Sequence, residues 1–302
     1  MSVVDEAAVQ EYNAFGPWVT AVTGPWDVPP LFASHRIDFD AARLILKFPR
    51  PESRRDLLAG MNLYDYLVVV TPASITVLKR HGDQVADGTF ALDQLATISS
   101  GADLLDGHLL MTFVDGSSYS IPYNGSASAT MARLVDTVRG MIGSARRPSL
   151  VGRAAGPRMP LSMDALGRED VGLANAANEV FSAENDLDVL SAAGRRIVTP
   201  RPGLLGDLRH RFAPTTLHGS VIAVTTKELV ILSRVRWLST GNAPDLSMRR
   251  TVIRLDRVTE ITAEPHSQHP EVTVVAVISD QSRFELFVGS DSAVITALVQ
   301  HN

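Results

Sequence analysis

Short apolar runs separated by polar turns dominate the hydropathy pattern of this chain. Residues 66–80 (YLVVVTPASITVLKR) and 220–234 (SVIAVTTKELVILSR) each hold two such runs around a polar turn, which predicts a β-hairpin. A gapless alignment of the two stretches has identical residues at Leu63/Leu217, Val70/Val224, Thr71/Thr225, Leu78/Leu232 and Arg80/Arg234. The sequence therefore predicts that one hairpin is built twice.

The correspondence continues beyond the hairpins. Residues 90–99 match residues 252–262, with identities at Leu92/Leu255, Asp93/Asp256 and Ile98/Ile261. The second copy has a longer loop before this match, RWLSTGNAPDLSMRR. Residues 108–121 and 272–288 then each predict two strands joined by a polar turn, at Asp115-Gly116 and at Asp280-Gln281.

Both copies end in a predicted helix. In the first, apolar residues between Ala127 and Ile142 recur at helical spacing after Ser126, a candidate N-cap. In the second, the same spacing occurs at Val294, Ile295, Leu298 and Val299, after a cap at Ser290 or Asp291. Such a unit buries one sheet face and protects its sheet edges when the helix plugs a bent sandwich or a partly open barrel.

The segments VTTKELVILSR, IRLDRVTEIT and VISDQSRFELFV, followed by a terminal helix, give the chain a resemblance to bacterial pleckstrin-homology-like (PH-like) families. The resemblance covers about residues 44–142 and 193–301; the first copy departs from the pattern at Pro72-Ala73-Ser74. It implies a mainly β protein with α: two tandem PH-like domains, each a bent β-sandwich or partly open barrel capped by a C-terminal helix. On this interpretation, no single sheet runs through both halves.

The predicted domains are an N-terminal helix and arm plus the first PH-like domain (1–142), an Arg/Pro/Gly-rich linker (143–170) and the second PH-like domain (171–302). A helix is expected at 174–194. The N-terminal helix is expected to place Val4, Ala8, Tyr12 and Phe15 on one side. In the arm, we expect Trp18, Trp26 and Phe32 to pack across the first domain; a partner-binding surface is the alternative.

Composition narrows the location and the partners. The formal net charge of −5 argues against a general nucleic-acid binder, because phosphate contacts require a basic surface. The chain has no cysteine, which fits a reducing cytoplasm and excludes disulfides, thiolate zinc sites and cysteine nucleophiles. Its first residues lack the pattern of a signal peptide, and no apolar stretch reaches the roughly 18–20 residues of a membrane span. We therefore expect a cytoplasmic protein whose membrane contact, if any, is peripheral.

Sequence motifs of enzymes are absent: there is no GxxxxGK[ST], no GxGxxG after a strand, no GxSxG and no HExxH. His266 and His269 form a close pair, but a solvated loop is a simpler interpretation than a metal site, which needs further ligands. Asp93 and Asp256 occupy matching positions and are expected to bond the backbone at a strand bend. No catalytic residue, metal or cofactor is predicted.

Each copy has one arginine-rich loop before its second strand. Eukaryotic PH domains carry, at this position, the basic loop that holds an anionic headgroup. Guanidinium groups bind phosphate and carboxylate oxygens in bidentate fashion, so the residue type suits anion recognition. A solvated or ion-paired surface is the alternative. The candidates are Lys47, Arg50, Arg54 and Arg55 in the first loop, and Arg195, Arg196, Arg201, Arg209 and Arg211 in the second. A further positive patch is predicted in the linker, at Arg146, Arg147, Arg153 and Arg158.

These features favour a non-enzymatic binding or scaffold protein that recognises a protein partner or associates with itself, since sheet edges and loops offer ready binding surfaces. The alternative is attachment to an anionic membrane or another anionic ligand through the arginine-rich loops. An enzyme with a pocket between the two domains is the third alternative.

Overall fold

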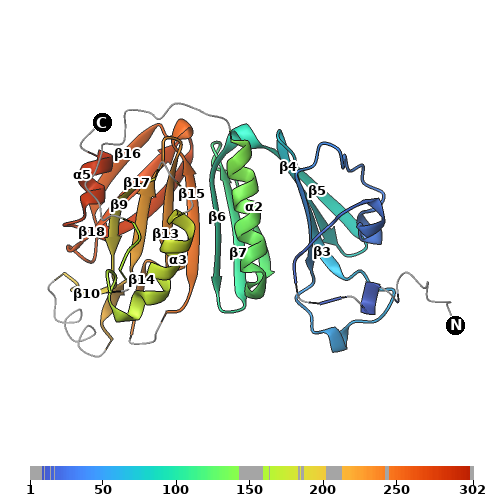
Figure 1. The fold of residues 1–302 in the computed structure, drawn as a ribbon, viewed down its shortest axis with the longest axis horizontal. Coiled ribbons are helices and arrows are strands. Elements are labelled where there is room, and N and C mark those ends of the chain that lie inside the picture. Colours follow the sequence, from blue (N-terminus) through green and yellow to red (C-terminus); the bar gives the residue numbers. More distant parts are fainter. Residues whose placement is uncertain are drawn as a thin grey trace. The chain divides into compact units, whose positions relative to one another are not determined.

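The protein is mainly β, with several antiparallel sheets and a few helices (Figure 1). The computed structural model describes residues 9, 11–13, 15–16, 18–142, 159–162, 164–182, 184, 187–201, 213–241 and 245–299. The chain forms two compact units, described separately below. Unit 1 consists of residues 1–95, 104–109 and 120–143, and unit 2 of residues 96–103, 110–119 and 144–302.

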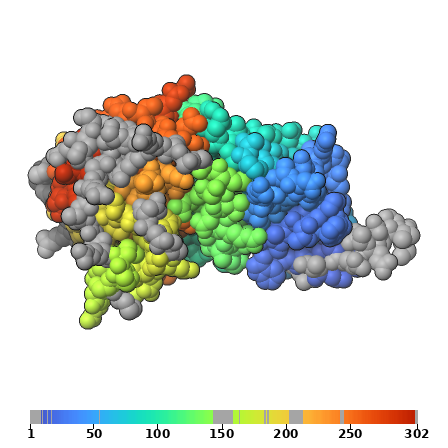
Figure 2. Space-filling view, turned by 45° about the horizontal axis from the view of Figure 1, so that its top comes forward, coloured from blue at the N-terminus to red at the C-terminus, as the bar shows by residue number. Residues whose placement is uncertain are grey.

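A five-stranded antiparallel sheet, in the order β1-β2-β3-β4-β5, forms the centre of unit 1 (blue to cyan in Figure 1). Its strands are β1 (Thr20–Ala21), β2 (Leu44–Pro49), β3 (Tyr64–Val70), β4 (Ser74–His81) and β5 (Gln84–Ala91). The first predicted hairpin is confirmed as β3–β4. Helix α2 (Ser128–Met141) follows the last strand of the first half and buries Met131, Leu134, Val135 and Val138. Its opposite side lies on the surface (green in Figure 2).

The N-terminal arm packs on the sheet of unit 1. Tyr12, Phe15, Val22 and Phe32 join one buried cluster with Leu67 and other apolar residues of β2–β4. Phe32 is fully buried, as predicted. The prediction is wrong for the two tryptophans, since Trp18 is 57% and Trp26 is 83% exposed.

The two tryptophan rings lie against the glycine two residues before each of them. A Cβ added to Gly16 would stand 2.1 Å from the Trp18 ring, and one added to Gly24 would stand 2.4 Å from the Trp26 ring. These rings therefore cover local backbone instead of reaching the core. Of the expected N-terminal helix, Val4 and Ala8 lie outside the described residues, while Val9 and residues 11–13 are helical.

A seven-stranded antiparallel sheet has the order β8-β7-β6-β15-β13-β12-β9. From the first half of the sequence it takes β6 (Leu95–Asp103), β7 (Asp106–Phe113) and β8 (Ser118–Asn124); from the second half it takes β9 (Asp188–Ala193), β12 (Ser220–Val224), β13 (Glu228–Ser233) and β15 (Met248–Arg254). Within unit 2, β15 pairs with β6 from Met248↔Ala102 to Ile253↔Thr97. The expectation that no sheet would draw strands from both halves is therefore wrong, because the outer edge of β15 is paired by a strand from the first half.

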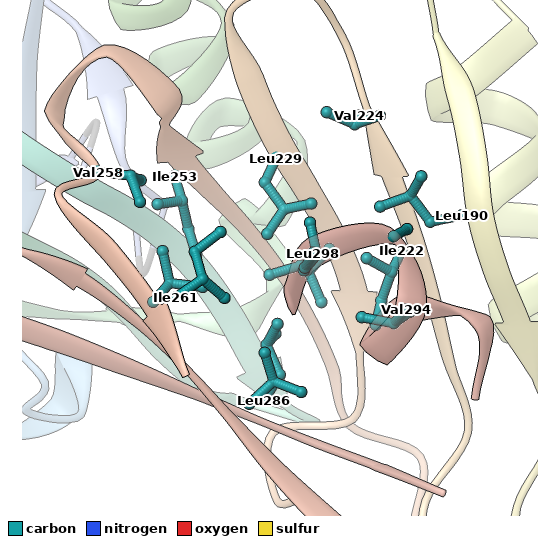
Figure 3. Close-up of a cluster of buried hydrophobic side chains, with 14 of the residues drawn as sticks. Leu190, Ile222, Val224, Leu229, Ile253, Val258, Ile261, Leu286, Val294 and Leu298 are labelled. Atoms are coloured by element: carbon teal, nitrogen blue, oxygen red, sulfur yellow. The ribbon is translucent and has the colours of Figure 1, made fainter. Parts of the chain in front are cut away.

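The core of unit 2 collects side chains from two sheets and a helix (Figure 3). The second sheet is β16-β17-β18, formed by β16 (Glu260–Pro265), β17 (Val272–Ser279) and β18 (Ser282–Gly289). Helix α5 (Ala293–Val299) follows β18, and its Val294 and Leu298 point into the cluster between Ile222, Leu229 and Leu286. The predicted second hairpin, the turn at Asp280-Gln281 and the terminal helix are thus confirmed.

The repeat extends to individual hydrogen bonds. Thr71 Oγ1 accepts bonds from the N–H groups of Ala73 and Ser74, and Thr225 Oγ1 accepts them from Lys227 and Glu228. The Leu92 N–H donates to Ala73 O, and the Leu255 N–H donates to Lys227 O, both at 2.9 Å. Each leucine opens a 3-10 turn, Leu92–Gln94 or Leu255–Arg257. Aligned residues therefore have the same local roles in both halves.

Several local predictions need correction. The helix expected at 174–194 is α3, which spans only Val171–Ser182, and the chain is extended again at β9 because β12 pairs with it. Asn124, not Ser126, provides the side-chain cap before α2, since its Oδ1 accepts from the Ser126 N–H. Asp256 forms ion pairs with Arg254 and Arg257. The predicted boundaries at 142/143 and 170/171 stay a prediction.

We predict that Leu298→Ala lowers the free energy of unfolding by about 2–5 kcal/mol, because it leaves a cavity where both sheets meet α5. Leu246→Ala is the control, since Leu246 is 66% exposed; it should change stability by no more than about 0.5 kcal/mol. Chemical denaturation monitored by circular dichroism measures both. Equal effects would contradict the described core.

Candidate functional site

An additional three-stranded sheet distinguishes the second half of the chain from the first. Its strands are β10 (Arg196–Val198), β11 (Thr215–Leu217) and β14 (Leu238–Thr240), in that order. β10 and β11 lie in the connection between β9 and β12, and β14 lies in the long loop between β13 and β15. The first half has only a Gly82-Asp83 turn where that long loop occurs, so this accessory sheet is built from what the second copy adds.

A buried ion pair lies at the base of the accessory sheet. Arg234 Nη2 is 2.8 Å from Asp170 Oδ1, and the two side chains are only 5% and 2% exposed. Arg234 Nη1 donates to Ser247 O, and Asp170 Oδ2 accepts from the Arg195 N–H at 2.9 Å. Because Asp170 immediately precedes α3 and Arg234 follows β13, the ion pair fixes the start of α3 to the end of β13 in the seven-stranded sheet. A Cβ at Gly219 would stand 2.5 Å from Asp170 Oδ2, so the site requires glycine there.

His218 occupies a buried polar position between the accessory sheet and the loop after β14. Its Nε2 lies 2.7 Å from Ser239 Oγ and 3.7 Å from Asp245 Oδ2. Burial lowers the pKa of His218 below its usual value, outweighing the nearby carboxylates. In a nucleophilic triad, the imidazole contacts the serine through one nitrogen and the carboxylate through the other. Here both groups face the same nitrogen, so the arrangement orients the loop and lacks the relay geometry of a triad.

A first pocket of about 230 Å³ opens beside His218 and contains Arg196. Arg196 Nη1 pairs with Asp291 at 3.0 Å, and Nη2 donates to Glu271 O at 3.0 Å. A Cβ at Gly289 would collide with the guanidinium group. Arg196 is therefore committed to holding β10 against the loop between β18 and α5, and most of its charge is already compensated.

A second, larger pocket, of about 520 Å³, lies against β11, β14 and the loop between β16 and β17. We name it the His–Arg pocket; its lining residues are Pro200, Arg201, Ala213, Thr215, Leu238, Thr240, His266, Ser267, Gln268 and His269. None of them is acidic. The backbone N–H of Arg201 donates to Gln268 O at 2.8 Å, while its exposed side chain has no ion pair within the described part of the chain. Among the described lining residues, the pocket therefore carries a cation without a counter-charge.

The two histidines of this pocket are ordered by their surroundings. His266 Nδ1 accepts from the N–H groups of Gln268 and His269, both at 3.2 Å, so the neutral ring carries its proton on Nε2. The rings of His266 and His269 stack at 5.2 Å, and His266 also contacts Phe287 at 5.6 Å. Burial and the charge of His269 lower the pKa of His266. The interpretation of this segment as a solvated loop is wrong for His269, which is only 6% exposed.

The predicted basic residues do not form one surface. Lys47 pairs with Asp27 at 2.5 Å, Arg50 with Glu52 at 2.5 Å, and Arg195 with Glu169. Arg55 is 86% exposed, with a weak 3.8 Å contact to Asp56. The side chain of Arg54 and all of Arg209, Arg211, Arg146, Arg147, Arg153 and Arg158 lie outside the described residues. Arg201 is thus the described candidate that lines a pocket and has no acidic partner there.

Sequence reasoning missed Asp170, His218, Arg234 and Asp245, although one signal pointed to Arg234. Arg234 aligns with Arg80, which lies at the end of the equivalent hairpin and pairs with Asp65 at 2.7 Å. The two arginines take their carboxylates from unrelated segments, so the alignment identifies the cation but not its partner.

Comparison of the chain with protein-family models, with curated proteins and with solved structures found no match. Within the described ranges, no helix combines the length and the apolar character needed to cross a membrane.

We predict that the stability of the protein falls as the pH drops from 6.5 through the lowered pKa of His218. The unfolded chain binds a proton in this range that the buried neutral ring resists, so protonation favours unfolding. Thermal melts across this pH range should show a flatter profile for His218→Gln. His81→Gln, at an exposed histidine, should leave the slope of the parent protein, and an unchanged slope in His218→Gln would contradict this role.

Arg234→Met should lower the free energy of unfolding by about 3–5 kcal/mol, since it leaves the Asp170 carboxylate buried without its cation. Adding Asp170→Asn should recover part of the loss. The matched control is Arg283→Met, which removes an exposed ion pair with Glu285 and should cost less than about 1 kcal/mol. Urea denaturation compares the variants, and similar losses at both sites would refute the structural role of the buried pair.

Proposed function

We propose that this is a non-enzymatic binding protein of two tandem PH-like domains, and that the second domain binds an anionic group in the His–Arg pocket. The observation that carries the proposal is the pocket itself: its described lining residues include Arg201 and two ordered histidines but no carboxylate.

The order of elements supports the PH-like assignment. Four strands (β2–β5, or β9, β12, β13 and β15), a 3-10 turn that begins with leucine, three further strands and a helix follow one another in both halves. The accessory sheet lies in the connections between the first and second and between the third and fourth strands of the second copy. The resemblance places the basic, headgroup-binding loop of eukaryotic PH domains between the first and second strands, and Arg201 lies in that connection.

The chemistry of the pocket suits a phosphate or carboxylate group. A guanidinium presents paired donors to such oxygens, and neutral His266 adds an Nε2–H donor. Thr215, Thr240 and Gln268 add neutral hydrogen-bonding groups at the wall. The volume of about 520 Å³ is ample for a phosphorylated headgroup or a small polyanion.

A binding role agrees better with the polar groups of unit 2 than catalysis does. The cluster of histidine, serine and carboxylate at His218 places the serine and the carboxylate on one nitrogen, unlike a nucleophilic triad. We further propose a cytoplasmic location, in keeping with a chain without cysteine, where the anionic group is either a free metabolite or a lipid headgroup at the membrane surface.

We predict that Arg201→Ser weakens binding of inorganic pyrophosphate at least tenfold in isothermal titration calorimetry, because it removes the cation of the pocket. Arg55→Ser is the matched control, with the same change of net charge at an exposed residue of unit 1, and should bind as the parent does. A second arm measures co-sedimentation with vesicles of phosphatidylglycerol and of phosphatidylcholine, and so separates a lipid headgroup from a free anion.

Anion binding should weaken as salt rises, since the contact is electrostatic. If the parent protein binds phosphatidylglycerol vesicles and Arg201→Ser does not, the ligand is a lipid headgroup. If the parent binds pyrophosphate but no vesicles, and Arg201→Ser loses pyrophosphate binding, the ligand is a free anion. Equal binding by both variants, or no binding of either probe, would refute the anion site.

A further inference from the structure

The outer edge of β5 corresponds to the outer edge of β15 in the second half, which is paired by another strand. Ser74 lies three residues after Thr71 and pairs with Ala91, and Glu228 lies three residues after Thr225 and pairs with Arg254. β5 and β15 are therefore equivalent strands. β15 is bonded on its far side by β6, whereas β5 ends its sheet.

The hydrogen-bond pattern shows which residues of β5 face outward. Opposite residues in an antiparallel pair alternate between bonded and non-bonded positions, and Leu92 N–H bonds Ala73 O. Phe90, Gly88 and Ala86 consequently bond β4. Val85, Asp87, Thr89 and Ala91 direct their N–H and C=O groups to the edge. In β15, the same alternation turns Met248, Arg250 and Val252 toward β6.

The β5 edge has few of the devices that usually protect an exposed strand, since Asp87 is its one charged residue. It spans eight residues without proline or lysine, and Asp87, Thr89 and Ala91 are exposed. The other strands that end a sheet are shorter, interrupted or more charged. β1, β10 and β14 have two or three residues, β8 contains Pro122, β16 ends at Pro265, β9 faces a bulge in its pairing, and β18 carries both Arg283 and Glu285.

We propose that β5 pairs antiparallel with β5 of a second copy of this chain, about a twofold axis at Gly88. This register places Asp87 opposite Thr89 of the second copy and Val85 opposite Ala91. The backbone N–H and C=O groups that face the edge of one strand then meet those of the other strand. The Asp87 carboxylate then faces the Thr89 hydroxyl group, which also hydrogen-bonds Thr76 Oγ1 at 3.1 Å. Moving the axis to Asp87 would oppose two carboxylates, which is unfavourable.

Self-pairing is favoured over an unrelated strand because the edge matches itself in length and in the alternation of its outward groups. Gly88 adds no side chain at the axis, where a non-bonded pair brings Cα atoms to about 4.5 Å. The two five-stranded sheets would form one continuous sheet. The contact is small, so we expect a reversible dimer with a dissociation constant in the micromolar range.

Thr89→Pro tests the pairing with little risk to the fold. Its N–H faces the edge and not β4, and the preceding Gly88 tolerates the restriction that proline imposes. Sedimentation equilibrium should show a concentration-dependent dimer for the parent protein and for Thr89→Val, and at least a tenfold weaker dimer for Thr89→Pro. A parent protein that stays monomeric, or a dimer that Thr89→Pro leaves intact, would overturn the proposal.

Cysteine pairs test the register, because the chain contains no cysteine of its own. A mixture of Asp87→Cys and Thr89→Cys should form disulfide-linked dimers with one chain of each kind under mild oxidation. Gln84→Cys is the control: in the proposed register its two sulfur atoms lie on the order of 26 Å apart, and it should not cross-link. Cross-linking by Gln84→Cys, or none in the mixture, would overturn the register even if Thr89→Pro failed to fold.

Discussion

The structure depends on one constraint: the N–H and C=O groups along a strand must find partners, and the most buried strands must find them on both sides. In unit 2, β13 is fully buried and is hydrogen-bonded to β12 on one side and to β15 on the other. The backbone groups on the outer side of β15 then need partners of their own. Met248, Arg250 and Val252 meet this need by pairing with Ala102, Ser100 and Ile98 of β6. The second copy of the repeat is thereby completed by a strand of the first.

The same constraint explains the accessory sheet. A long insertion between β9 and β12 and another between β13 and β15 would each leave a backbone without regular partners. Pairing of β11 with β10 on one side and with β14 on the other provides partners for both insertions. Apolar and polar contacts both hold these short strands. Val198, Leu217 and Leu238 of the three strands pack in one cluster with Val272 and Phe287, and His218 contacts Ser239. The pocket around Arg201 follows from this construction, because β11 and β14 of the added sheet form its wall opposite the His266–His269 loop.

Much of the fold was predictable from local pattern. The alternation in 66–80 and 220–234, the turns at Asp115-Gly116 and Asp280-Gln281 and the terminal helices were all correctly predicted, because each signal lies within one segment. The pairing of β6 with β15 was not predictable, since neither strand encodes its distant partner. Strand β9 was missed because Ala and Ser in DVLSAA suit a helix as well as a strand until β12 pairs with it.

The candidate site shows why charge alone was a poor guide. Nine basic residues were selected by type and position, yet Lys47, Arg195 and Arg196 are compensated by Asp27, Glu169 and Asp291, which come from other elements. A carboxylate that approaches only after folding leaves no mark beside its partner in the sequence. The useful distinction is which cation remains uncompensated once the fold has brought the acids in, and among the described pocket residues Arg201 meets that criterion. A basic cluster therefore marks a binding site only when the fold has kept its acids away.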